Sequence, residues 1–257
     1  MKGIVFAAGI GSRLKPFTDH HPKALAEIGG IPLLERVIKK LKSSGVDGIV
    51  VNVHHFSGQV VDFLKRNDNF GVDIEISDES QCLLDTGGGL AKMARESKLL
   101  RISQGEPIIV HNSDILTDFP LDQMVSSFNA EDYLSLILVD PDRFSTRSFL
   151  FGEGMRLVGW HNSQTLQTKP VQLDTKGLMP APFGGVHVIS RGTLDALDKE
   201  CGSIITPFSI TDFYLRQAAD KFIKGYIPKN NYSWYDIGTP EKLETAERGW
   251  AIKENKG

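Results

Sequence analysis

The glycine-rich segment that follows the first apolar run carries two cations and is the first candidate for chemistry. Residues 7–14 are Ala-Ala-Gly-Ile-Gly-Ser-Arg-Leu, and Lys23 stands in the Pro-Lys-Ala-Leu segment 22–25. Glycines in such a loop let the backbone approach a ligand and point its amides at phosphate oxygens. An arginine such as Arg13 grips phosphate with two hydrogen bonds, and a lysine such as Lys23 acts as a point charge. The segment predicts a polyphosphate-binding loop; the alternative is a surface turn with solvated cations.

This loop differs from two common phosphate-binding motifs. The dinucleotide-binding fingerprint needs a third glycine where Leu14 stands and a helix that begins at once, which Pro16 and Pro22 prevent. The Walker loop needs Gly-Lys followed by Ser or Thr, which this sequence lacks. The formal net charge is −3, so a broad attraction to nucleic acid is not expected. An anionic ligand must therefore be held by a few local cations and backbone amides.

Two aspartates stand where a metal could be held. Asp114 closely follows the apolar run 107–110, and Asp236 follows a Trp-Tyr pair near the end of the chain. Carboxylate oxygens suit Mg²⁺, which is typically held by one or two carboxylates together with substrate phosphates. A turn or a helix N-cap is the alternative role for each aspartate. Two such residues beside a phosphate loop favour the metal interpretation.

Composition bounds the class of protein. The chain has 257 residues, of which 40% are hydrophobic and 24% charged, as in an ordinary globular protein. No apolar run approaches the ~20 residues of a membrane span, and the N-terminus does not resemble a signal peptide. Two cysteines make no zinc site by themselves. We therefore expect a reducing, cytoplasmic setting, with no membrane and no nucleic acid as partner.

Strands and helices are expected to alternate, which favours a mostly parallel sheet with its ligands at the carboxyl ends of the strands. Residues 8–31 are expected to form one long loop. Strands are predicted at 2–7, 48–53, 72–76, 107–110, 132–139, 183–189, 223–227 and 233–237, and a hairpin at 149–151 and 155–160. Helices are predicted from Pro32 to Gly45, after an N-cap at Ser57, over 87–99, 191–199 and 209–219, and from Pro240. The polar segment 161–182 is expected to be an insertion or flap.

The spacing of these motifs resembles the sugar-1-phosphate nucleotidyltransferases, also called nucleoside-diphosphate-sugar pyrophosphorylases. The likeness begins with Gly-x-Gly-Ser-Arg-Leu-x-Pro-x-Thr over residues 9–18 and Pro-Lys-Ala-Leu over 22–25. It continues with Asp-Thr-Gly-Gly-Gly at 85–89, Asn-Ser-Asp at 112–114, Phe-Gly-Gly-Val at 183–186 and Trp-Tyr-Asp-Ile-Gly-Thr at 234–239. The match spans roughly residues 1–250.

The resemblance implies an α/β, Rossmann-like nucleotidyltransferase fold. We expect a mostly parallel central sheet flanked by helices and a small sugar-binding β subregion, all in a single domain over residues 1–257. Within it, 1–140 would be the nucleotide-binding core, 141–232 the sugar-binding subregion, and 233–257 a closing strand and C-terminal helix. The implied reaction joins an NTP and a sugar 1-phosphate, with Mg²⁺, into an NDP-sugar and pyrophosphate.

The resemblance also assigns roles to residues. The catalytic set would be Arg13, Lys23, Asp114 and Asp236, with both aspartates holding Mg²⁺. The nucleotide would be contacted by Ala7, Ala8, Gly9, Gly11, Ser12, Arg13, Gly87 and Gly88. The sugar would be contacted by Gly185, and Asp140 is a further candidate because it follows the strand 132–139, although an Asp-Pro turn is the alternative there.

Within the family, the sequence is most similar to the uridylyltransferases that use UTP and N-acetylmuramate 1-phosphate. Guanylyltransferases for mannose or heptose 1-phosphate, a phosphocholine cytidylyltransferase and a non-catalytic binder of nucleotide sugars are the alternatives. The sequence departs from the family at Ser113, where glycine is usual. It also lacks a Glu-Lys pair before the sugar-contacting strand, where Lys169 and Lys176 are the available lysines.

Overall fold

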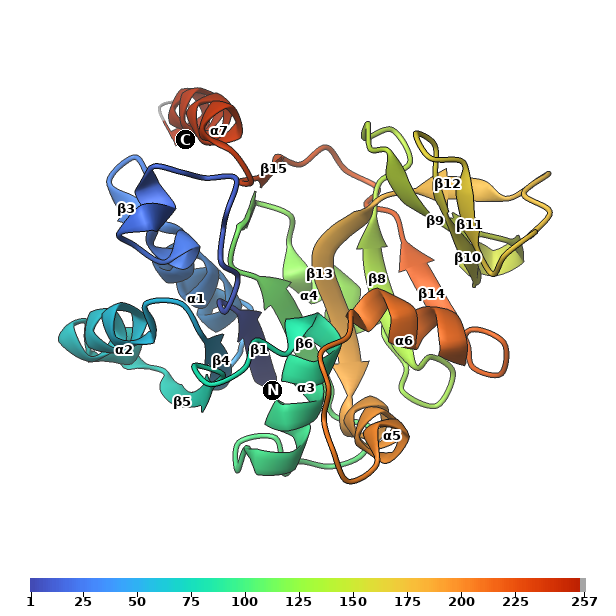
Figure 1. Cartoon of the computed structure of the whole chain (residues 1–257), viewed down its shortest axis with the longest axis horizontal. Helices are drawn as coiled ribbons and strands as arrows, with labels where there is room; N and C mark the ends of the chain where they lie inside the picture. Colours follow the sequence, from blue (N-terminus) through green and yellow to red (C-terminus); the bar gives the residue numbers. More distant parts are fainter. Residues whose placement is uncertain (255–257) are drawn as a thin grey trace.

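A seven-stranded sheet forms the centre of the computed structural model, which describes residues 1–254 (Figure 1). Its strands follow the order β14-β8-β13-β6-β1-β4-β5. Their bounds are β1 Lys2–Phe6, β4 Gly48–Val53, β5 Asp73–Asp78, β6 Pro107–Asn112, β8 Ser135–Val139, β13 Phe183–Ser190 and β14 Ile223–Tyr226. The inner strands are continuous apolar runs because helices cover both faces of the sheet.

The pairing of these strands confirms the predicted fold. β1 lies parallel to both β4 and β6, β4 is parallel to β5, and β8 is parallel to β14. β13 alone within the seven strands runs antiparallel, against β6 on one side and β8 on the other. The carboxyl ends of β1, β4, β5 and β6 therefore meet at one edge, where an α/β sheet places its ligands.

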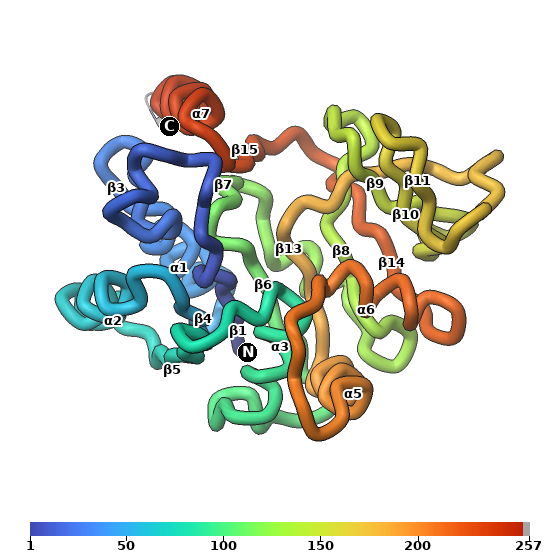
Figure 2. Tube along the Cα trace, viewed as in Figure 1, coloured from blue at the N-terminus to red at the C-terminus, as the bar shows by residue number. Residues whose placement is uncertain are grey.

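Helices cover the two faces of the sheet in two groups (Figure 2). One face packs against α3, α5 and α6, with buried side chains such as Leu90, Leu194 and Phe213. The other packs against α1, α2 and α4 through side chains such as Leu34 and Leu121. Their bounds are α1 Leu33–Ser43, α2 Ser57–Arg66, α3 Asp85–Glu96, α4 Leu121–Ser127, α5 Arg191–Cys201 and α6 Ile210–Gln217.

The last helix, α7 (Pro240–Glu254), packs on the glycine loop rather than on the central sheet. Ala246 of α7 is buried together with Leu14, Leu116 and Ile237. The short strand β15 (Trp234–Asp236) leads into α7 and pairs with β7 (Ile115–Thr117) directly after Asp114. This arrangement brings the end of the chain beside the loop at its beginning, as Figure 1 shows.

A second, four-stranded antiparallel sheet lies at the β8–β14 end of the molecule (Figure 1). It consists of β9 Arg147–Phe151, β10 Leu157–Asn162, β11 Gln167–Lys169 and β12 Met179–Ala181. The predicted hairpin is thus present as β9 and β10, and the expected flap at 161–182 supplies the two outer strands. The predicted subregion 141–232 does not follow the sheets, because β13 and β14 lie within it and belong to the central sheet.

Several predicted boundaries were wrong. Ser57 is the first residue of α2 rather than its N-cap, which is Phe56 in the left-handed region at φ 53°. α3 begins at Asp85, before the glycines, and ends at Glu96. The loop 8–31 contains two short 3-10 turns, at Phe17–Asp19 and Lys23–Leu25, and the two-residue strands β2 (Glu27–Ile28) and β3 (Ile31–Pro32). No helix in residues 1–254 is both long and apolar enough to cross a membrane.

Two buried histidines lie within the central sheet. His187 of β13 forms a hydrogen bond through Nδ1 with the hydroxyl of Tyr214 on α6, and that hydroxyl accepts from Ser135 Oγ at 3.0 Å. His111 of β6 is fully buried as well. Burial disfavours the charged imidazolium and lowers the pKa to about 3 for His187 and about 4 for His111. Both rings are therefore neutral in the native protein at neutral pH.

We predict that acid destabilises the protein through these histidines. The unfolded chain binds a proton at each near pH 6.5, whereas the native state binds it only near pH 3–4. Their stabilising effect is full above pH 6.5, and about 1.4 kcal/mol per histidine is lost for each pH unit below it. Urea unfolding at pH 7.5 and 5.0 measures this loss, which should be smaller in His187→Gln. Equal stability at both pH values would contradict the assignment.

Candidate active site

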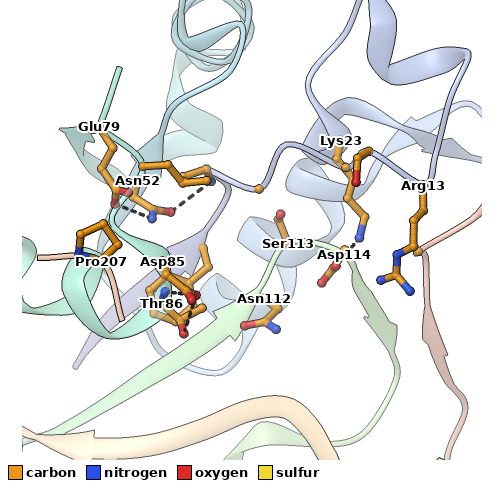
Figure 3. Close-up of a pocket in the computed structure, with 17 residues that line it drawn as sticks. Arg13, Lys23, Asn52, Glu79, Asp85, Thr86, Asn112, Ser113, Asp114 and Pro207 are labelled. Carbon is orange, nitrogen blue, oxygen red and sulfur yellow. Dashed lines mark hydrogen bonds and ion pairs between the residues drawn. The ribbon is translucent and has the colours of Figure 1, made fainter. Parts of the chain in front are cut away.

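A cavity of about 470 Å³ opens at the carboxyl ends of β1, β4, β5 and β6. Figure 3 shows Asn52 and Glu79 at one end of it and Lys23, Asp114 and Arg13 at the other. The predicted nucleotide-contacting residues that line it are Ala8, Gly9, Gly11, Ser12 and Arg13. We refer to it below as the nucleotide cavity, after the ligand that the sequence predicts for these residues.

Asn52, at the end of β4, forms hydrogen bonds with the segments that follow β1 and β5 at this cavity. Its Oδ1 accepts hydrogen bonds from the backbone amides of Ala7 at 2.7 Å and Ala8 at 3.3 Å. Its Nδ2 donates to Glu79 Oε1 at 2.7 Å, and Glu79 Oε2 accepts from the amide of Leu84 at 3.0 Å. Ala7, which was also predicted to contact the nucleotide, does not line the cavity, and its amide donates to Asn52.

Glu79 is a residue that the sequence motifs did not single out. It directly follows β5, and only 2% of its surface is exposed. Burial raises the pKa of its carboxyl group, and the hydrogen bonds from Asn52 and Leu84 oppose that rise. The carboxylate therefore fixes both Asn52 and the backbone that leads into α3.

The glycine loop is shaped by Gly11. Its φ is +68°, and a Cβ there would lie 2.9 Å from Thr18 Cγ2 and 3.0 Å from Lys23 Cβ. Any other residue would therefore be both strained and crowded. The carbonyl of Gly11 accepts from Leu14 N at 2.8 Å and from Thr18 Oγ1 at 2.9 Å. These contacts fold the loop back so that Lys23 lies beside Gly11.

Lys23 and Asp114 form an ion pair at the floor of the nucleotide cavity. Only 12% of the lysine side chain and 25% of the aspartate side chain are exposed, so solvent screens this pair less than a surface pair. Arg13, in contrast, is an exposed side chain of the same cavity. The structure thus brings together the two cations and the first aspartate of the predicted catalytic set.

A second cavity, of about 300 Å³, meets the first at Asn112 and Asp114, which line both. We call it the acceptor cavity, after the sugar phosphate that the sequence predicts as the second substrate. Its wall contains the predicted residues Asp236 and Gly185, and also Arg143, Trp234 and Lys242. Lys242, near the start of α7, donates to Asp236 Oδ2 at 2.5 Å. The backbones of Asp114 and Asp236 lie close together. The amide of Ile237, the residue after Asp236, donates to the carbonyl of Asp114 at 2.9 Å.

Gly185 and Ser113 fit this junction closely. Gly185 has φ +73°, and a Cβ there would lie 2.5 Å from Ile115 Cγ1 and 3.2 Å from Asn112 Nδ2. Ser113, where the family usually has glycine, is 5% exposed and donates its amide to the carbonyl of Phe6 at 3.0 Å. Its side chain therefore fits beside Asp114 without opening the sheet.

Gly87 and Gly88 lie away from the wall of the nucleotide cavity, although both were predicted to contact the nucleotide. Both amides donate to the carbonyl of Phe208, at 2.8 and 3.3 Å. A Cβ at Gly87 would lie 2.3 Å from the Phe208 ring, and one at Gly88 would lie 2.8 Å from Thr206 O. Because these glycines have no side chain, the segment before α6 can pack directly against the start of α3. Asp85, Thr86 and Pro207 line the cavity instead.

Asp140 also lies outside the lining of the acceptor cavity. Its Oδ1 accepts from the amide of Asp142 at 3.1 Å, and its Oδ2 accepts from the hydroxyl of Tyr232 at 3.1 Å. The turn that was the alternative interpretation of Asp140 is therefore present. Of the two lysines in 161–182, Lys169 forms an ion pair with Asp212 at 2.7 Å, and neither Lys169 nor Lys176 lines either cavity.

Comparison with known proteins agrees with this geometry. A family model described as nucleotidyl transferase matches residues 2–147. The N-acetylmuramate alpha-1-phosphate uridylyltransferase of Caulobacter vibrioides is 29% identical over 95% of this chain and 94% of its own. The mannose-1-phosphate guanyltransferase of Schizosaccharomyces pombe is 26% identical over 95% of this chain and 63% of its own.

A solved structure of a UDP-glucose pyrophosphorylase with UDP-glucose has the same fold, with a TM-score of 0.73. It is 20% identical, and the superposition covers 98% of each chain. Because the family model covers more than half of the sequence, this chain belongs to the nucleotidyl transferase family, as the spacing of its motifs predicted.

Proposed function

We propose that this enzyme transfers a uridylyl group from UTP to N-acetylmuramate 1-phosphate and releases pyrophosphate. The observation that carries the proposal is the meeting of the two cavities at Asp114, with cations on both sides. A nucleoside triphosphate in one cavity and a sugar phosphate in the other would place their phosphates side by side. The choice of uridylyl and N-acetylmuramate is supported by the similarity to the Caulobacter enzyme along nearly the full length of both chains.

The reaction is a displacement at phosphorus. A phosphate oxygen of the sugar 1-phosphate attacks the α-phosphorus of UTP, a new P–O bond forms, and the bond to the bridging oxygen of pyrophosphate breaks. The attacking phosphate is already ionised, so no base is needed to activate it. The main barrier is the approach of two anions, and catalysis consists of positioning and neutralisation of charge.

Each cation of the site has a part in this neutralisation. Arg13 is an exposed side chain that lines the nucleotide cavity, where it would bind the triphosphate. Lys23 lies beside Asp114 at the junction, where it would bind the reacting phosphates. Lys242 lies in the acceptor cavity and would bind the incoming sugar phosphate. The amides of the glycine loop would add hydrogen bonds without side-chain charge.

Asp114 and Asp236 fit the requirements of Mg²⁺, which we propose as the cofactor. Both are carboxylates on the wall of the acceptor cavity, and each carries a lysine on one oxygen, Oδ2, which leaves Oδ1 for a metal. Residues 1–254 contain no cluster of three or more His, Cys, Asp or Glu side chains that could hold a metal ion. This pair would thus need phosphate oxygens to complete the shell, and the ion would supply charge neutralisation there.

A guanylyltransferase that acts on mannose 1-phosphate is the second candidate, and the similarity to the Schizosaccharomyces enzyme favours it. Pyrophosphate release should be measured for each of the four NTPs against N-acetylmuramate, N-acetylglucosamine, mannose, glucose and heptose 1-phosphates. A dominant rate with UTP and N-acetylmuramate 1-phosphate is expected. A dominant rate with GTP and mannose 1-phosphate would replace the first proposal, and nucleotide binding without turnover would favour a non-catalytic role.

We predict that Asp114→Asn lowers kcat by a factor on the order of 10²–10³, because the electrostatic stabilisation at the α-phosphate is lost. Asp236→Asn should act in the same direction. Both variants should need more Mg²⁺ for half-maximal rate, which a Mg²⁺ titration of pyrophosphate release measures. Asp62→Asn, an exposed aspartate on α2, is the matched control and should leave the titration unchanged. Wild-type Mg²⁺ dependence in both site variants would refute the metal assignment.

We predict that Arg13→Gln raises the KM for the NTP by about 10- to 100-fold, as expected for the loss of a charge-assisted hydrogen bond of about 1.5–3 kcal/mol. The KM for the sugar phosphate should change much less. Lys15→Gln on the same loop is the control, since Lys15 is paired with Asp19 at 2.8 Å and does not line the nucleotide cavity. Initial rates at varied NTP and fixed acceptor give both constants. An unchanged KM for the NTP would leave Arg13 as a surface residue only.

A further inference from the structure

Arg143 is a half-buried residue on the wall of the acceptor cavity, and its guanidinium has no anionic partner within residues 1–254. Its guanidinium carbon lies 3.8 Å from the centre of the Trp234 ring, and its Nη2 donates to the carbonyl of Pro182 at 2.8 Å. Its Nη1 is buried and has no hydrogen-bond partner in residues 1–254. A buried charge is costly unless it is paired and hydrogen-bonded. The guanidinium thus has an unsatisfied donor, and an anion in the acceptor cavity would supply the missing negative charge.

The neighbouring carboxylates do not form an ion pair with Arg143 within residues 1–254. Burial lowers the pKa of Arg143, and Tyr232, Asp140 and Asp236 oppose that fall, so the arginine stays charged at neutral pH. Asp140 is engaged by Tyr232 and by the amide of Asp142. Asp236 is engaged by Lys242. Within the described chain, neither forms an ion pair with Arg143.

The stacking on Trp234 orients the guanidinium for one class of ligand. Stacking occupies a face of the planar group and leaves its N–H bonds directed sideways, in the plane. A planar oxyanion can accept two parallel hydrogen bonds from that edge. Ser145 and Phe183 line the same cavity as Arg143, so its wall offers both a hydroxyl and an apolar ring, which suit a sugar.

Arg143 is held at a different position of β15 from the one that carries Asp236. Trp234 and Asp236 are two residues apart on β15 and both line the acceptor cavity. Alternate residues of a strand lie about 6–7 Å apart on one face. The ring on which Arg143 stacks and the carboxylate of Asp236 therefore extend from backbone positions about 6–7 Å apart. The cations nearest that carboxylate and Asp114 are paired lysines, Lys242 and Lys23. Arg143 is thus placed for a second anionic group of the acceptor.

We propose that Arg143 binds a carboxylate carried by the acceptor sugar and so selects an acidic sugar 1-phosphate over a neutral one. The inference rests on the proposed function and refines its substrate class. The lactyl ether of N-acetylmuramate supplies a carboxylate on the sugar ring that N-acetylglucosamine lacks. The two sugars are otherwise alike, so the preference between them measures what Arg143 contributes.

The test compares Arg143→Gln, Arg143→Lys and the wild type on N-acetylmuramate 1-phosphate and N-acetylglucosamine 1-phosphate. Pyrophosphate release gives kcat/KM for each acceptor. In Arg143→Gln the value for the acidic sugar should fall about 10- to 100-fold, mainly through KM, and the value for the neutral sugar should stay within about threefold. Arg143→Lys keeps the charge but loses the planar fork, so it should retain part of the preference.

Arg156→Gln is the matched control. Arg156 also lies over an aromatic ring, that of Phe222 at 5.4 Å, and donates to the carbonyl of Ala218 at 3.3 Å, but it does not line the acceptor cavity. This variant should keep the wild-type preference. Thermal unfolding of all variants separates a loss of folding from a loss of binding. An equal loss for both acceptors in Arg143→Gln would assign Arg143 to the reacting phosphate, and no loss for the acidic acceptor would remove its role; either result overturns the proposal.

A binding measurement keeps the test independent of turnover. Because Arg143 stacks on Trp234, a ligand at its edge should change tryptophan fluorescence. Titration with unphosphorylated N-acetylmuramic acid should give a saturable change in the wild type and none in Arg143→Gln, and N-acetylglucosamine should give none in either. If no NTP supports turnover but this response is present, the proposed reaction fails and the role of Arg143 stands. If turnover is seen without any preference for the acidic sugar, the proposed reaction stands and the proposed role of Arg143 fails.

Discussion

The site depends on the parallel pairing of β1 with β6, which aligns Phe6 with Asn112. Because the two strands end at the same edge in this register, the glycine loop and Asp114 must leave the sheet side by side. The ion pair between Lys23 and Asp114 follows from that alignment, since the loop returns over the end of β6. Parallel strands need a crossover between them, so the residues that meet here are supplied by segments far apart in the chain.

The buried bridge through Asn52 extends this alignment across the neighbouring strands. One amide side chain satisfies the amides after β1 and also binds the carboxylate after β5. A buried polar network of this kind is costly if one member is missing, because the others are left unpaired. The cavity wall opposite the ion pair is therefore fixed by buried hydrogen bonds, whereas Arg13 is an exposed side chain of the same cavity.

Much of this could be predicted from the sequence because it follows local patterns. Glycines after an apolar run, aspartates after strands and the alternation of strands with helices indicated the fold, the loop and the aspartates. The contacts that could not be predicted join distant segments. Gly87 and Gly88 are explained by Phe208, and Arg143 by Trp234, and no local spacing relates the members of either pair. Asp140 was predicted to contact the sugar, but it forms the turn that was the alternative interpretation, and Arg143 lines the cavity.

The contact between α3 and the segment before α6 has a consequence for the order in which the molecule forms during synthesis. The carbonyl of Phe208 holds the amides that begin α3, Thr86 Oγ1 accepts from Ile210 N, and Pro207 lines the nucleotide cavity. The ribosome releases these residues long after the glycine loop and β6. A nascent chain that ends within β9 has the cations and Asp114 but lacks one wall of the cavity. The nucleotide cavity is therefore complete only after the segment before α6 has been synthesised. A shorter nascent chain lacks the complete cavity that would bind a triphosphate.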